Sequence, residues 1–315
     1  MKLVVLDGYT MNSGHDLSWA GIEGFGETII YDRTQPEETA ERIKDADIVI
    51  VNKVKLTRAA LEGATKLKFI TLLATGYDCI DRAAAEELGI IVSNIPTYGT
   101  DTVAQFTLAL ILELTNQVGQ HSESVKAGGW ISSPDWTYRL SPQIELRDKT
   151  LGIIGYGRIG HRVGELAACF GMKVITVERT GREFDIPSVS LEELLRTSDF
   201  VILNCPLTEE TRGIINKTTL ALMKPSAFLI NDSRGPLVVD EDLRAALDEG
   251  IIAGAAVDVI SEEPMPLGHP LKDAKNIIIT PHIAWSTKAA RNRLMETTKA
   301  NIEAYLAGVP QFRVI

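Results

Sequence analysis

Residues 151–160 read LGIIGYGRIG, a short apolar run that passes directly into the pattern G-x-G-x-x-G. The run has the length of a buried strand, and the stretch that follows, HRVGELAACFG, is typical of a helix. Gly155 permits a tight turn, Gly157 lets the backbone approach a pyrophosphate, and Gly160 allows the helix to pack closely on the strand. The N-terminus of the helix adds N–H donors and a positive dipole. The stretch therefore predicts a dinucleotide-binding strand–turn–helix unit.

The next apolar run, residues 174–177, ends at Glu178, close to the spacing expected for the acid that binds the adenosine ribose. A carboxylate there hydrogen-bonds the ribose hydroxyls and repels a 2′-phosphate, so Glu178 favours NAD. Arg179 and Arg182 follow closely, and an arginine at this place can accommodate the phosphate of NADP. NAD is the expected cofactor, and NADP stays open.

Two series of short apolar runs alternate with helical patterns along the chain, which predicts parallel sheets built from βαβ units. The first series of expected strands comprises residues 3–6, 28–31, 48–51, 69–73 and 90–92, with helices at 36–43, 58–61 and 82–88. The second series comprises residues 151–154, 174–177, 200–203, 228–231, 253–257 and 277–279. A long apolar helix is expected over 101–118, an irregular connection over 128–146, and a last helix over 286–306.

Length and composition limit the class of protein. A chain of 315 residues with 45% hydrophobic residues has room for two domains, each with its own core. The net charge of −10 argues against sequence-independent binding of nucleic acid and against an anionic membrane surface. Three scattered cysteines argue against a disulfide framework and a structural zinc site. We see no signal segment and no run long enough to span a bilayer, so the expected compartment is the cytoplasm.

Three further motifs each follow one of the predicted strands, and they are NDSRG (231–235), DVISEEP (258–264) and TPHI (280–283). In a doubly wound sheet the carboxyl ends of the strands face the ligand crevice, so Arg234, Glu263 and His282 are expected to converge there. Hydride reduction of a 2-oxo acid needs a proton donor, a cation for the carboxylate and carbonyl, and a carboxylate that orients the donor. Histidine suits proton exchange near neutrality, and a paired carboxylate stabilises its protonated form.

With these motifs the chain resembles the D-2-hydroxyacid dehydrogenase family, and within it the NADH-dependent hydroxypyruvate reductases (glycerate dehydrogenases). The resemblance covers nearly the whole chain and rests on VVLDGYT (4–10), ATGYDCID (74–81), TDTVAQFTLAL (100–110), LGIIGYGRIG (151–160), NDSRG (231–235), EEP (262–264) and TPHIAW (280–285). It implies reduction of a small 2-oxo acid, such as hydroxypyruvate or glyoxylate, to the D-2-hydroxy acid.

The resemblance also implies site residues. It assigns catalytic roles to Arg234, Glu263 and His282, and it assigns the substrate carboxylate to Arg234 and to backbone amides around Thr75, Gly76 and Tyr77. It places Arg158 and Ile159 at the pyrophosphate, and Thr102, Cys205, Ser233 and Asp258 along the cofactor. Lys53 and Trp285 resemble positions that flank the substrate, and Trp136 one that reaches a site across a dimer, although packing or a solvated loop explains these three equally well.

The fold implied by the resemblance is discontinuous and α/β, with two doubly wound parallel-sheet domains. A Rossmann cofactor domain (100–286) is inserted in a flavodoxin-like catalytic domain (1–99 and 287–315). Family members are commonly dimers, and the apolar helix near 102–114 suits such a contact.

Three alternatives stay open from the sequence. The protein could reduce another 2-oxo acid, such as pyruvate or a longer one. It could instead be an NAD-sensing binding protein on the same fold, as some transcriptional co-repressors are, although the intact Arg234, Glu263 and His282 argue against this. The third alternative is a purely structural oligomer, but such a protein would have no need of a nucleotide-binding loop beside the three predicted catalytic residues.

Overall fold

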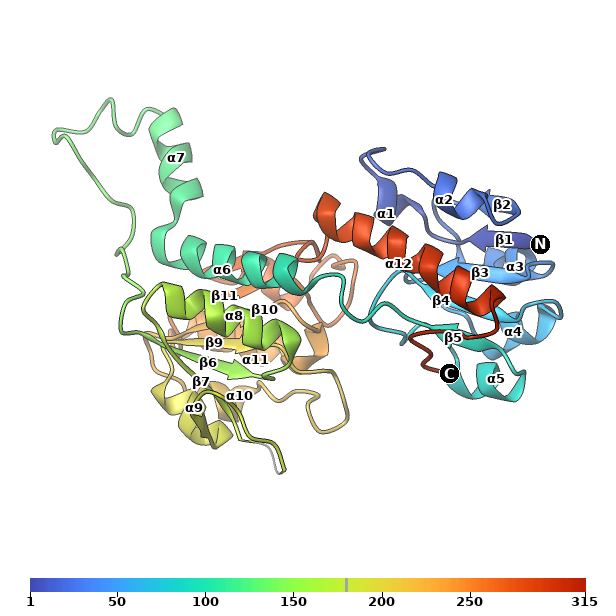
Figure 1. Ribbon diagram of the computed structural model, residues 1–315. Helices are drawn as coiled ribbons and strands as arrows, with labels where there is room; N and C mark the ends of the chain where they lie inside the picture. The colour runs from blue at the N-terminus through green and yellow to red at the C-terminus, as the bar shows by residue number, and fades with distance from the viewer. Residues whose placement is uncertain (179–180) are drawn as a thin grey trace. The chain divides into compact units, whose positions relative to one another are not determined.

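The computed structural model describes residues 1–178 and 181–315, which form two compact units (Figure 1). Unit 1 comprises residues 1–99 and 285–315, and unit 2 comprises residues 100–284 between them. Each unit is built around one parallel β-sheet, which confirms the predicted α/β class. In the part of the chain that is described, none of the helices combines the length and the apolar character needed to cross a membrane.

Unit 1 contains a five-stranded parallel sheet with the strand order β2-β1-β3-β4-β5, which is the flavodoxin order. Its strands are β1 (Lys2–Val5), β2 (Glu27–Ile30), β3 (Ile48–Val51), β4 (Phe69–Leu72) and β5 (Ile91–Ser93). Its helices are α1 (Tyr9–Asn12), α2 (Ala20–Glu23), α3 (Thr39–Ile43), α4 (Arg58–Gly63), α5 (Arg82–Glu87) and α12 (Lys288–Leu306), and η1 (Pro36–Glu38) is a 3₁₀ turn. Strands β3 and β4 are buried throughout, because helices cover both faces of the sheet.

Local signals start the helices of unit 1. The hydroxyl of Thr57 accepts the N–H of Ala60 and the carboxylate of Asp81 accepts the N–H of Ala84, so each residue caps the N-terminus of the helix that follows.

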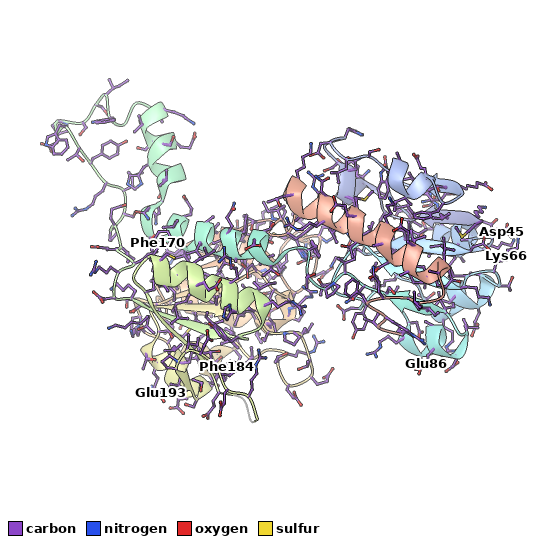
Figure 2. All side chains as sticks on the ribbon, in the orientation of Figure 1. Asp45, Lys66, Glu86, Phe170, Phe184 and Glu193 are labelled. Atoms are coloured by element: carbon purple, nitrogen blue, oxygen red, sulfur yellow. The ribbon has the colours of Figure 1, made fainter. Side chains whose placement is uncertain are left out.

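The surface of unit 1 carries charged side chains. Asp45, Lys66 and Glu86, for example, are exposed to solvent (Figure 2).

Unit 2 contains a seven-stranded parallel sheet with the order β12-β11-β10-β9-β6-β7-β8. Counted from β6, six of these strands follow the Rossmann order 3-2-1-4-5-6. The strands are β6 (Thr150–Ile154), β7 (Lys173–Val177), β8 (Ser188–Val189), β9 (Phe200–Leu203), β10 (Phe228–Asn231), β11 (Gly254–Val257) and β12 (Ile277–Ile279). The helices are α6 (Thr100–Asn116), α7 (Val118–Lys126), α8 (Arg158–Cys169), α9 (Leu191–Thr197), α10 (Lys217–Leu220) and α11 (Asp240–Asp248), with 3₁₀ turns η2 (Gly235–Leu237) and η3 (Pro270–Asp273).

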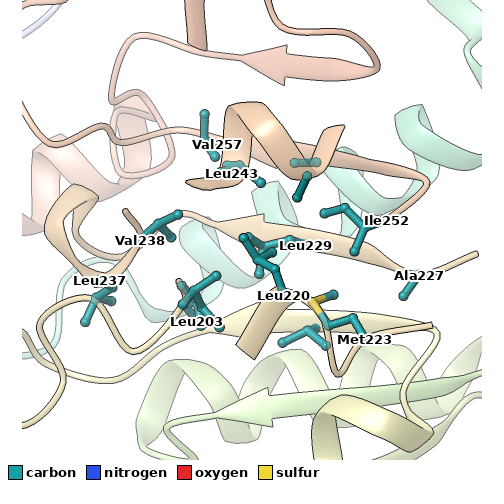
Figure 3. Close-up of a cluster of buried hydrophobic side chains, with 14 of the residues drawn as sticks. Leu203, Leu220, Met223, Ala227, Leu229, Leu237, Val238, Leu243, Ile252 and Val257 are labelled. Atoms are coloured by element: carbon teal, nitrogen blue, oxygen red, sulfur yellow. The ribbon is translucent and has the colours of Figure 1, made fainter. Parts of the chain in front are cut away.

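The core of unit 2 lies on both faces of this sheet. On one face, strand residues such as Leu203 and Leu229 pack against Leu220 of α10 and Leu243 of α11 (Figure 3). On the other face, α6 and α8 cover the strands. Buried apolar area of this kind is the main stabilising contribution to the sheet that carries the site.

One predicted helix is wrong in its extent. The expected helix over 101–118 ends at Asn116, because Gln117 adopts a left-handed conformation (φ 46°), and α7 then runs to Lys126 without a buried residue. The predicted irregular connection follows as far as residue 149. Together, α7 and residues 127–146 form an arm (residues 118–146), most of which extends away from the sheet of unit 2 (Figure 1), while Leu146 at its end is buried against the core. The two-residue strand β8 was not predicted, since its pattern is too short to be distinctive.

Candidate active site

The glycine-rich turn after β6 has the conformation that a dinucleotide needs. Gly155 has a φ of +103°, and a Cβ on it would lie 2.3 Å from the backbone nitrogen of Cys205. A Cβ on Gly160 would lie 2.4 Å from the carbonyl oxygen of Gly155. Around Gly157, by contrast, no described atom other than those of its own chain neighbours lies within 4 Å of where a Cβ would be, so the backbone there borders open space. Two glycines close the turn, and the third leaves it accessible.

This open backbone begins α8, whose N-cap Gly157 supplies no side-chain cap. The first backbone N–H groups of a helix lack intrahelical partners, and with the helix dipole they form an anion site. Residues Gly157–Gly160 therefore fit a pyrophosphate, with Arg158 adding positive charge at the first helical position. The structure thus fits the predicted dinucleotide, which the N–H groups of this turn would hold.

A cavity of about 470 Å³ opens beside this turn, and its lining includes Gly157, Arg158, Arg182 and Phe184. The Arg182 guanidinium donates a hydrogen bond to the carbonyl of Tyr156 at 3.0 Å and lies 5.0 Å from the centre of the Phe184 ring. Phe184, on the segment that also carries Arg182, is labelled in Figure 2.

Burial and the nearby Asp185 carboxylate raise the pKa of Tyr156 to about 12. Glu178 is exposed at the end of β7, four residues before Arg182, so acid and arginine stand on the same segment. Arg179, the other arginine of the NADP alternative, lies outside the described residues.

The three predicted catalytic residues lie on loops that follow the neighbouring strands β10, β11 and β12. Nδ1 of His282 is 2.7 Å from Oε2 of Glu263, so the ring can donate its Nδ1–H to the carboxylate. Nη1 of Arg234 donates to the carbonyl of Ser233 at 2.8 Å. A Cβ on Gly235 would lie 1.7 Å from the carbonyl oxygen of Ile260, so the loop of Arg234 lies directly against the loop of Glu263.

Asp258 fixes the backbone that carries His282. Its carboxylate accepts the hydroxyl of Thr280 at 2.6 Å and the N–H groups of Ile283 at 2.9 Å and Ala284 at 2.8 Å. The N–H of His282 donates to the Asp258 carbonyl at 2.8 Å, and His282 itself has a φ of +55°. Burial raises the pKa of Asp258, although these hydrogen bonds oppose the shift. Asp258 was expected along the cofactor, and in the structure its carboxylate holds the His282 loop.

Other residues expected along the cofactor gather at the same end of the sheet. The Ser233 hydroxyl donates to the carbonyl of Cys205 at 3.0 Å, and the nitrogen of Cys205 is the atom that Gly155 approaches. Burial raises the pKa of the Cys205 thiol, which keeps it protonated and unreactive at neutral pH. Thr102 is buried in the first turns of α6.

Sequence reasoning missed Asp232, a buried acid next to these residues. Its carboxyl contacts the hydroxyl of Thr107, and it accepts the amide of Asn204 at 3.4 Å. Burial is the main reason that the pKa of Asp232 rises to about 7, and the neighbouring charge of Asp258 adds to the rise. An acid directly after the apolar run FLIN was the available signal, because a strand end at the centre of a sheet is usually dry.

In unit 1 the loop after β4 carries the residues expected to bind the substrate carboxylate, Thr75, Gly76 and Tyr77. The hydroxyl of Thr75 donates to the carbonyl of Ile95 at 2.7 Å, and the amide of Asn94 donates to the carbonyl of Thr75 at 2.7 Å. These bonds fix the start of the loop.

The loop after β3 is fixed by a buried acid. The Asp7 carboxylate accepts the N–H groups of Asn52 at 2.8 Å, Lys53 at 2.6 Å and Val54 at 3.2 Å. Burial raises the pKa of Asp7 more than these bonds lower it. Trp285 packs edge-on against Tyr98, with ring centroids 6.5 Å apart.

The chain is similar to known oxidoreductases. The profile described as "D-isomer specific 2-hydroxyacid dehydrogenase, NAD binding domain" matches residues 108–284. A hydroxypyruvate reductase from Blautia hydrogenotrophica is 48% identical over 98% of both chains. Among solved structures, an acyclic imino acid reductase in complex with NADPH and D-Arg has a TM-score of 0.88 at 32% identity over the whole of both chains. A D-lactate dehydrogenase from Aquifex aeolicus, complexed with NAD and lactic acid, has a TM-score of 0.84 at 31% identity, covering 98% of this chain and 96% of its own.

Proposed function

The chain belongs to the D-isomer specific 2-hydroxyacid dehydrogenase family, and on that premise we propose that the protein reduces hydroxypyruvate to D-glycerate, or glyoxylate to glycolate, with NADH. The observation that carries the proposal is the 2.7 Å contact between His282 and Glu263, on loops of the same sheet that carries the open glycine turn. The relative named hydroxypyruvate reductase supports the choice of acid.

Each proposed catalytic residue has one task. His282 donates a proton to the carbonyl oxygen of the acid, and Glu263 orients the ring through Nδ1 and stabilises the imidazolium. The Arg234 guanidinium binds the carboxylate and polarises the carbonyl. Backbone amides around residues 75–77 bind the same carboxylate. NADH, when bound, supplies the hydride.

We also propose the division of labour between the parts of the chain. Residues 1–99 and 287–315 form the substrate-binding domain, and residues 100–286 form the NAD-binding domain. The carboxylate of Glu178 favours NADH. Arg182, which donates a hydrogen bond to the Tyr156 carbonyl, is the residue that accommodates the 2′-phosphate of NADPH, so some turnover with NADPH is also expected. The three cysteines are free, which suits the reducing cytoplasm that we propose as the compartment.

A substrate panel tests the proposal. Purified protein is mixed with hydroxypyruvate, glyoxylate, pyruvate and a longer 2-oxo acid, each with NADH and with NADPH, and absorbance at 340 nm is followed. We expect the largest kcat/KM with hydroxypyruvate or glyoxylate and NADH. A clear preference for NADPH would overturn the argument from Glu178, and nucleotide binding without turnover of any acid would favour an NAD-sensing protein instead.

We further propose that the protein is a homodimer joined through the arm of unit 2 (residues 118–146). Apolar side chains on the arm are largely exposed, including Ile131 (91%) and Trp136 (86%). The arm is nevertheless ordered by its own bonds, such as that from Nε1 of Trp130 to the Trp136 carbonyl at 3.1 Å. An exposed apolar patch on an ordered segment is typical of an interface.

Sedimentation velocity tests this assembly. Wild-type protein is expected to sediment as two chains, and the double variant Ile131→Ser, Trp136→Ser as one chain, because the apolar contact is lost. Leu267→Ser is the matched control, since Leu267 is equally exposed (96%) in unit 2 but lies outside the arm. A wild-type protein that stays monomeric at micromolar concentration would contradict the proposal.

A further inference from the structure

Asp240 is a buried acid of unit 2 that the proposed reaction does not use directly. It is the first residue of α11 and is only 4% exposed. Its Oδ2 accepts the backbone N–H of Ser261 at 3.1 Å. An acid at the start of a helix is favoured by the helix dipole, but that effect does not require burial or a bond to a distant loop. Burying a carboxylate is costly unless it is paired, so the contacts of Asp240 need another reason.

The second contact of Asp240 is His269, which is 7% exposed. Nε2 of His269 lies 3.0 Å from Oδ2 of Asp240, in a direction poor for a hydrogen bond, and within the described residues this nitrogen has no hydrogen-bond partner. Nδ1 accepts the N–H of Leu271 at 3.3 Å, so the proton of a neutral ring sits on Nε2, toward the carboxylate. Both side chains are buried, so His269 Nε2 is the polar atom that lies beside Oδ2 of Asp240 in place of water.

The bond from Ser261 leads directly to the proposed catalytic pair. Ser261 is two residues before Glu263, whose Oε1 accepts the N–H of Ile260 at 3.4 Å and whose Oε2 contacts His282. On its other side, the same loop lies against Gly235. Asp240 therefore holds one point of a short loop whose end carries the carboxylate that orients His282.

We propose that Asp240, supported by His269, is a positioning residue that sets the placement of Glu263 against His282. This inference rests on the proposed function for its effect on turnover. The charged groups that face this chain of contacts include His269 beside Asp240, and Glu263 and Asp258 beside His282. A displaced Glu263 stabilises the protonated imidazole less, so the proton donor is lost at lower pH.

Two variants and one control test the role. Asp240→Ala removes the acceptor for Ser261, whereas Asp240→Asn keeps an acceptor and removes the charge. We expect Asp240→Ala to lower kcat/KM for the acid by an order of magnitude or more and to move the midpoint of its basic limb to lower pH by at least about half a unit. The kcat/KM and the pH midpoint of Asp240→Asn are expected to lie between those of Asp240→Ala and those of the wild type. The Kd for NADH stays within twofold.

The control is Asp242→Asn on the same first turn of α11. Asp242 accepts the N–H of Lys217 at 2.8 Å and has no bond to the Glu263 loop among those described. It should leave the pH midpoint and kcat/KM unchanged. If Asp240→Asn and Asp240→Ala lower the melting temperature but keep the wild-type pH midpoint, Asp240 is only structural and the proposal is wrong.

A second measurement separates this inference from the proposed function. The imidazole of His282 is titrated by ¹H–¹³C NMR in the full chain without cofactor, with its signal assigned through His282→Asn. A downward shift of the titration midpoint in Asp240→Asn supports the positioning role even if the wild type reduces none of the acids. An unchanged midpoint overturns it, whatever the activity.

Discussion

Replacing His282 by asparagine is expected to lower kcat for hydroxypyruvate reduction by roughly 10²–10⁴-fold, because proton transfer from a positioned side chain contributes about that much. Asparagine is the better test than alanine, since His282 has a φ of +55° and asparagine tolerates the left-handed region. The Kd for NADH, measured by fluorescence titration, is expected to change less than about threefold, because the glycine turn lies on a different strand from this loop.

The companion variant Glu263→Gln separates orientation from charge. The amide oxygen of glutamine can still accept the Nδ1–H of His282, but it cannot stabilise the imidazolium. Its loss in kcat should be smaller than that of His282→Asn, and it should grow with pH. His15→Asn is the matched histidine control, because His15 is exposed and has a similar φ of +50°, and it should leave turnover unchanged. Unchanged turnover in His282→Asn would refute its role as the acid.

The sequence predicted the scaffold well because the relevant signals are local. The runs 48–51, 200–203, 228–231 and 277–279 coincide with observed strands, since each is a short β-branched or aromatic run with a turn beyond it. The glycine turn was equally predictable, because a φ of +103° at Gly155 can be tolerated by few residues other than glycine.

Features that depend on contacts between distant segments were not predictable. The break at Gln117 falls on a residue other than glycine or proline, two residues before Gly119, so the helix pattern ran past it. The approach of Gly235 to Ile260 and the contact between Asp240 and His269 join residues that are 25 and 29 positions apart in sequence. Such pairs exist only once the sheet has set the order of its strands.

Asp232 is expected to make the stability of the protein depend on pH in the direction opposite to that of most acids. The Thr107 hydroxyl has one proton, yet it contacts both the Val103 carbonyl, at 2.9 Å, and the Asp232 carboxyl. If the hydroxyl donates to Val103, the contact with Asp232 requires a proton on the acid. This geometry agrees with a pKa of about 7 for Asp232.

The sign follows from linkage. The pKa of Asp232 is about 7 in the folded chain and near 3.8 when exposed. Between these values the folded state holds a proton that the unfolded state has lost, so the free energy of unfolding falls as pH rises from about 4 to about 7 and then levels off. The whole fall amounts to at most about 4 kcal/mol. Asp232→Asn is neutral at every pH and lacks this fall.

Urea unfolding of wild type and Asp232→Asn at pH 5, 6, 7 and 8 measures the difference. We expect the free energy of unfolding of Asp232→Asn, relative to that of the wild type, to rise by roughly 2–3 kcal/mol between pH 5 and pH 8. Asp248→Asn is the control, because Arg244 holds the pKa of Asp248 below its usual range and the carboxylate stays ionised across this interval. The plot of its free energy of unfolding against pH should run parallel to that of the wild type. A parallel curve for Asp232→Asn as well would mean that Asp232 does not change its protonation here, and that the Thr107 hydroxyl donates to a carboxylate already ionised at pH 5.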